Sequence, residues 1–183
     1  AVAQAPQTLP MLTVTAPPIA ETLTVPSLEA AQEAAASTPG GAAVVPAEDY
    51  RDGRATNVRD ILNLVPGVFA QPKYGQEDSR LSIRGSGVSP NFHLRSIQLY
   101  MDGIPMNTSD GYGDFQEIDP TIYKYVEVYK GANALRYGAN SLGGAINFVM
   151  PTGYSSDLFT ARTDFGSFGF HKLALSSGAT AGR

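Results

Sequence analysis

The feature that most constrains the fold of this chain is the shortness of its apolar segments. Between residues 42 and 149, apolar residues come in brief alternating or continuous stretches, and glycine or proline lies close to most of them. Brief stretches bounded by turn-forming residues are typical of short β-strands. We therefore expect strands at 43–45, 68–70, 81–84, 97–101, 123–129 and 145–149.

One segment has the spacing of an amphipathic helix instead. Its apolar residues recur at i, i+3, i+4 and i+7, and they are Val58, Ile61, Leu62 and Val65. Thr56 is a candidate N-cap, and the Pro-Gly pair after Val65 ends the helix. With a shorter helix or turn at 133–137, the sequence predicts an α+β domain in which short strands carry two or three short helices.

The first 46 residues differ from the rest in composition. They hold seven of the thirteen prolines, no lysine or arginine, and three glutamates as their only charges. Such a segment buries too little apolar surface to offset the entropy lost on ordering. We expect residues 1–41 to form a disordered arm, except that 28–37 is rich in helix formers and Ser27 is a possible N-cap. The folded domain is expected at 42–152.

The pattern changes again after Gly153. Residues 157–165 and 170–177 alternate and are joined by Gly-Ser-Phe-Gly. One side of the first segment carries Phe159, Ala161, Thr163 and Phe165, and the other carries more polar residues. This length and alternation suit either a transmembrane β-hairpin or the edge hairpin of a water-soluble sheet.

Composition and motifs weigh against several classes of function. The net charge of −4 gives no basic surface for nucleic acid, and the absence of cysteine removes disulfides and thiolate sites. His93 and His171 lack HExxH spacing, and neither a GxSxG motif nor a phosphate-binding P-loop is present. Asp110 to Asp114 lacks the alternating ligands of an EF-hand. We therefore expect no enzyme activity, no cofactor and no bound metal.

Four segments, in this order, resemble the plug domain of TonB-dependent outer-membrane receptors of Gram-negative bacteria. They are ATNVRDILNLVPGVF, LSIRGSG, IQLYMDGIPMN and YVEVYKGANALRYGANSLGGAINFV. The run FHLRSIQLYMDGIPMN is most similar to the branch that takes up ferric dicitrate and related iron chelates. The resemblance implies a mixed four-stranded sheet with flanking helices, set inside a β-barrel. It also implies that Gly143 and Gly144 let the backbone pass close to neighbouring strands or the barrel wall.

The resemblance also implies that a short β-prone segment of the arm, the Ton box, pairs as an added strand with the periplasmic protein TonB. Met11, Leu12, Thr13, Val14, Thr15 and Ala16 resemble such a box. Residues 21–25 are a second candidate.

Two cations match positions that in the family pair with glutamates of the barrel wall. Arg84, in SIRG, is the first, and Lys130, in YKG, is the second, where arginine is usual. Lysine cannot form the bidentate fork with a carboxylate, so we expect a weaker plug–barrel lock at Lys130. The outward loops 73–79, 90–95 and 108–116 are expected to meet the substrate. The candidate substrate-binding residues are His93, Arg95, Tyr112 and Gln116.

A barrel of about 22 strands of about ten residues each needs far more chain than follows Thr152. We therefore expect the chain to be a fragment that holds the plug and, at 153–183, the first transmembrane hairpin of its barrel. The expected function is that of a gate for a ferric chelate, with iron citrate, another siderophore or a different metallophore open as cargo. The alternative is a free-standing periplasmic binding or adaptor domain with the plug fold.

Overall fold

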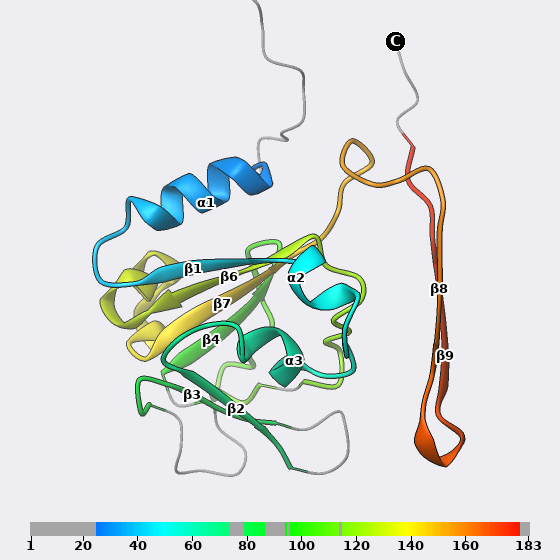
Figure 1. Cartoon of the computed structure of the whole chain (residues 1–183). Coiled ribbons are helices and arrows are strands. Elements are labelled where there is room, and N and C mark those ends of the chain that lie inside the picture. Colours follow the sequence, from blue (N-terminus) through cyan, green and yellow to red (C-terminus); the bar gives the residue numbers. More distant parts are fainter. Residues whose placement is uncertain (1–24, 74–78, 87–93, 95, 114, 180–183) are drawn as a thin grey trace, which may run out of the picture.

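The computed structural model describes residues 25–73, 79–86, 94, 96–113 and 115–179. Within them a sheet of order β1–β6–β7–β4–β5 forms the centre of the molecule (Figure 1), and only the β4–β7 pair is parallel. The expected mixed sheet is thus confirmed as four longer strands plus a two-residue strand, β5. The strands are β1 (Ala42–Pro46), β4 (Ile97–Met101), β5 (Ile104–Pro105), β6 (Tyr125–Lys130) and β7 (Gly144–Val149).

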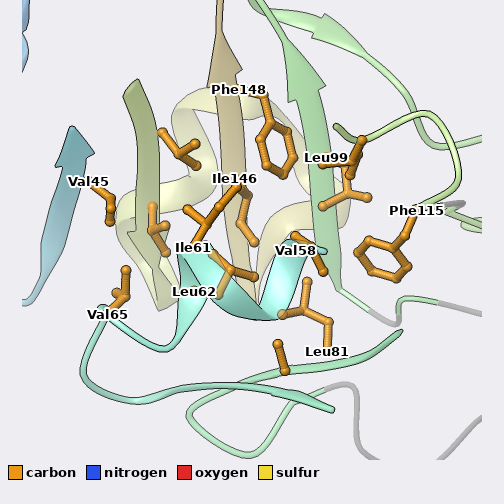
Figure 2. Close-up of a cluster of buried hydrophobic side chains, with 14 of the residues drawn as sticks. Val45, Val58, Ile61, Leu62, Val65, Leu81, Leu99, Phe115, Ile146 and Phe148 are labelled. Atoms are coloured by element: carbon orange, nitrogen blue, oxygen red, sulfur yellow. The ribbon is translucent and has the colours of Figure 1, made fainter. Parts of the chain in front are cut away.

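One face of this sheet is covered by the short helix α3 (Val58–Leu62), below which lies the two-stranded sheet of β2 (Val68–Pro72) and β3 (Ser79–Ile83). Figure 2 shows Ile61 and Leu62 of α3 pointing toward Ile146 of β7. The apolar residues at helical spacing are all buried, which confirms the amphipathic pattern.

The prediction that Thr56 caps α3 is wrong by one residue, since the N-cap is Asn57. The reason is the carboxylate of Asp60, which accepts hydrogen bonds from the backbone N–H of both Thr56 (2.9 Å) and Asn57 (3.2 Å). A carboxylate at the third helical position reaches back to satisfy N–H groups that have no intrahelical partner.

The other face of the sheet is covered by α1 (Leu28–Ala36) and by the 3₁₀ helices η1 (Gly131–Tyr137) and η2 (Ala139–Ser141). Ser27 caps α1 as expected, because its hydroxyl accepts a hydrogen bond from the N–H of Ala30. Ala31 and Ala35 of α1 are buried, and Tyr125 donates its hydroxyl to the carbonyl of Pro26 at 3.0 Å. The sheet is therefore buried on both faces, although its strands alternate in sequence.

The close approach expected at the glycine pair is confirmed. A Cβ on Gly144 would lie 2.5 Å from Cδ1 of Ile83 and 2.9 Å from the carbonyl oxygen of Tyr129, and one on Gly143 would overlap the side chain of Ser86. Only glycine fits where β7 starts, because the space for a side chain is already filled.

A separate hairpin follows the domain, made of β8 (Thr160–Phe165) and β9 (His171–Ser176), with η3 (Ser167–Gly169) in its turn. It runs along the side of the domain near the short helix α2 (Glu48–Arg51) in Figure 1. Among the described residues, no helix combines the length and the apolar character needed to cross a bilayer.

Candidate plug–barrel contact and ligand loops

Arg84 and Lys130 lie together, although 46 positions separate them in sequence. Arg84 directly follows β3 and Lys130 ends β6. The Arg84 guanidinium donates to the carbonyl of Gly40, and the Lys130 ammonium donates to the carbonyl of Pro66 at 3.0 Å. Gly41 passes close to both, since a Cβ there would lie 2.9 Å from Nη2 of Arg84 and 3.1 Å from Cε of Lys130. The structure thus brings the two predicted lock residues into one site.

The electrostatics of this site favour an added anion. Within the described part of the chain, neither cation has a carboxylate within 4.0 Å. Partial burial and the neighbouring charge of Arg84 together hold the pKa of Lys130 below its usual value. Two like charges that share only neutral carbonyl partners repel each other, and a carboxylate brought between them would relieve that repulsion.

Of the predicted ligand residues, Tyr112 and Gln116 lie in the described structure, and both are exposed. The loop that carries Tyr112 is folded around Asp110, whose carboxylate accepts from the N–H of Tyr112 (3.2 Å) and from the hydroxyl of Thr108. Such a turn holds the Tyr112 backbone in place while its ring faces solvent.

Leu94, the one described residue of the predicted ligand loop 90–95, contacts the loop 108–116. The N–H of Leu94 donates to the carbonyl of Gly111 at 3.2 Å, and the Leu94 side chain occupies the space that a Cβ on Gly113 would fill. His93 and Arg95 lie outside the described residues, as do most of loop 73–79, Ton box 11–16 and residues 21–24 of the second candidate box. Val25, the last residue of that second box, packs beside Tyr125 and Val149.

A buried polar network was missed by the sequence analysis. Glu127, in the middle of β6, is only 6% exposed. Its carboxylate accepts hydrogen bonds from Nδ2 of Asn147 (2.9 Å) and the hydroxyl of Tyr137 (3.2 Å). Burial, reinforced by the Glu127 charge, raises the pKa of Tyr137 above its usual value, so the phenol stays a donor.

Arg136 extends this network at the surface of η1. It donates to the hydroxyl of Tyr129 at 3.2 Å and lies over the Tyr129 ring, 5.0 Å from its centroid. The sequence contains one indication of this network. Glu127 alternates with Tyr125 and Tyr129, so the three side chains share one face of a strand. That face is buried because α1 packs over Tyr125 and η1 returns over Tyr129.

No group of three or more His, Cys, Asp or Glu side chains in the described residues is arranged to hold a metal ion. Asp114, the last residue of the loop compared above with a calcium site, lies outside them.

Comparison with known proteins identifies the fold. The model of the TonB-dependent Receptor Plug Domain family matches residues 34–145. A hemin receptor of Yersinia enterocolitica is 30% identical over 105 residues, which is 57% of this chain and 14% of the receptor. The vitamin B12 transporter BtuB of Vibrio vulnificus is 28% identical over 62% of this chain and 18% of the transporter.

Solved structures agree on the fold. The ferric enterobactin receptor PfeA of Pseudomonas aeruginosa matches with a TM-score of 0.54 and 21% identity, over 75% of this chain and 21% of that one. The siderophore receptor PirA of Acinetobacter baumannii matches with a TM-score of 0.53 and 20% identity, over 72% and 20% of the two chains. The chain therefore spans about a fifth or less of these relatives, and it belongs to the family of TonB-dependent receptor plug domains.

Proposed function

We propose that this chain is the plug and first barrel hairpin of an outer-membrane transporter for a ferric chelate, and that TonB drives it by pairing with residues 11–16. The observation that carries the proposal is the family match over residues 34–145, since it covers three of the four segments whose order suggested a plug in full and most of the fourth. We propose that the plug lies in the lumen of a barrel, with the N-terminal arm in the periplasm.

The hairpin supports the barrel part of this proposal. The side chains of Phe165, Leu173 and Leu175 share one face of β8–β9 and are 81%, 65% and 62% exposed. The opposite face carries Arg162, Asp164 and Lys172. An apolar outer face with a polar inner face is the arrangement of a strand pair in a transmembrane barrel, whose outside meets lipid.

The cation pair supports contact with the barrel wall. Arg84 and Lys130 present two positive charges at the surface, and we propose that glutamates of the barrel wall pair with them. A guanidinium forms the stronger, bidentate contact with a carboxylate, so Arg84 would supply most of the binding.

The substrate class is part of the proposal. Relatives are named for hemin, vitamin B12 and ferric enterobactin. We propose a ferric chelate with anionic groups, because the predicted ligand loops carry His93 and Arg95, and arginine binds carboxylates well. Tyr112 and Gln116 would add hydrogen bonds. Iron enters as cargo and not as a resident cofactor.

Two peptides test the TonB part of the proposal. We expect a peptide of residues 8–18 to bind the C-terminal domain of TonB in calorimetry, and a scrambled peptide of the same composition not to bind. Binding by a peptide of residues 19–28 alone would move the Ton box to the second candidate. If neither peptide binds, TonB does not act through this arm.

A further inference from the structure

The polar face of the β8–β9 hairpin is turned toward the domain, and its contacts suggest a docking surface distinct from the Arg84–Lys130 pair. Strand register places Arg162 beside Ala174 and Asp164 beside Lys172 on this face. These side chains are partly buried, whereas the residues between them on each strand are exposed. The hairpin therefore has a definite inner side in this chain.

The first contact is an ion pair across to the segment before β6. The Lys172 ammonium donates to Oδ1 of Asp119 at 2.6 Å and to the hydroxyl oxygen of Thr121 at 3.1 Å. The same Asp119 oxygen accepts from the N–H (2.9 Å) and hydroxyl (2.7 Å) of Thr121. Burial alone would raise the pKa of Asp119, but these hydrogen bonds outweigh it and hold the pKa below its usual value.

The second contact lies at the end of α2. Arg162 donates to the carbonyl of Arg51 and reaches that of Gly53 at 3.5 Å, while its Nε lies 2.9 Å from both oxygens of Asp164. Carbonyls at a helix end lack intrahelical donors, so a guanidinium satisfies them well. Arg162 is thus fixed by Asp164 in an orientation that faces α2.

The two parts of the domain that receive the hairpin are themselves joined. Nη2 of Arg51 donates to the carbonyl of Tyr123 at 3.2 Å, which ties α2 to the segment that holds Asp119 and Thr121. The receiving surface is therefore one unit, made of the end of α2 and residues 119–123.

We propose that this unit is a second barrel-facing docking surface of the plug, which anchors it to the first barrel hairpin through Lys172–Asp119 and Arg162–α2. The inference rests on the proposed function in one respect, namely that β8–β9 begins the barrel. Figure 1 shows the hairpin on the α2 side of the domain, whereas β1 starts and β6 ends at the opposite side, where Lys130 lies. The plug would thus be held to the wall at two opposite places, here and at Arg84 and Lys130.

A distance measurement tests the anchor. The chain has no cysteine, so spin labels on Arg59→Cys in α3 and Ser167→Cys in the hairpin turn report one distance by electron paramagnetic resonance. The full 183-residue chain is used, in detergent that covers the apolar outer face of the hairpin. We expect a narrow distance distribution, and we expect that narrow peak to be lost in the Lys172→Met, Arg162→Met double variant.

Controls make the outcome decisive. Arg54→Met also removes a cation near α2, but it breaks only contacts with Thr56 and Asp60, so its distribution should match that of the unmutated chain. Asp119→Asn keeps an oxygen for Thr121 while removing the charge, and it should broaden the distribution even if the double variant folds poorly. A distribution unchanged in both the double variant and Asp119→Asn would overturn the anchor. TonB binding by the arm is measured separately, so failure of the anchor leaves the proposed function standing.

Discussion

At the scale of single residues, the Arg84–Lys130 pair makes a titration prediction. Replacing Arg84 by Met removes one of the two causes that lower the pKa of Lys130, the neighbouring positive charge, so that pKa should rise toward its usual value. NMR titration of the Lys130 ε-methylene measures the shift. The pKa of Lys130 is lower in the folded chain than in the unfolded chain. The unmutated Lys130 therefore increases the free energy of unfolding as pH rises from the folded pKa to the unfolded pKa. An unchanged Lys130 pKa in the variant would show that the charges do not interact.

The buried carboxylate of Glu127 makes a second residue-scale prediction. Glu127→Gln keeps the shape of the side chain but replaces one carboxylate oxygen, an acceptor, with an NH₂ group, a donor. That donor would face Asn147 or Tyr137, which themselves donate to Glu127. We expect the free energy of unfolding to fall by about 1–3 kcal/mol, the cost of a mismatched buried hydrogen bond. Denaturant titration measures it, with Glu33→Gln on the exposed side of α1 as a control expected within about 0.5 kcal/mol of the unmutated chain. Equal stability of both variants would mean that the network does not stabilise the fold.

At the scale of elements, the start of β7 depends on Gly144. A methyl group there meets Ile83 and the Tyr129 carbonyl at distances no ordinary Cβ tolerates, so Gly144→Ala should destabilise the fold by about 1–3 kcal/mol. Gly53→Ala is the matched control, because its nearest contact would be an ordinary 3.6 Å to the carbonyl of Tyr50. Thermal unfolding of the two variants checks the difference. Equal melting temperatures would show that β7 shifts to accommodate the methyl group.

Much of this element structure could be predicted from sequence, because it is local. Apolar spacing located α3, alternation located β6, and the Asp-Gly pair at 102–103 marked the turn between β4 and β5. The strand order could not be predicted from these patterns, since β1 pairs with β6 across about eighty residues and no local feature encodes that pairing. The resemblance to a known plug implied a mixed four-stranded sheet, and the structure supplies its strand order.

In the candidate site, too, the residues could be predicted from local motifs, whereas their arrangement in space could not. Arg84 and Lys130 were named by matching motifs, but their convergence on Gly40 and Pro66 depends on how β3 and β6 end in space. Glu127 was missed because a glutamate in an alternating strand normally faces water, whereas here the elements that pack over the sheet, η1 among them, bury it.

At the scale of the whole molecule, the hairpin leaves an apolar face exposed. Because Phe165, Leu173 and Leu175 lie together on it, we expect the isolated chain to self-associate in water and to become monomeric in mild detergent. Replacing all three by Ser should make it monomeric without detergent. Sedimentation velocity measures both. If the chain is already monomeric at high concentration in water, the proposal that this face of the hairpin contacts lipid is contradicted.

The central claim is that this molecule is a plug on which TonB acts through residues 11–16. The most direct test is titration of the whole chain with labelled TonB C-terminal domain, before and after Val14→Pro. Proline removes a backbone donor and cannot serve in a paired strand, so we expect binding by the unmutated chain and its loss in the variant. Binding that survives Val14→Pro would contradict a Ton box at 11–16. Absence of binding by the unmutated chain would contradict the claim that TonB acts on this arm.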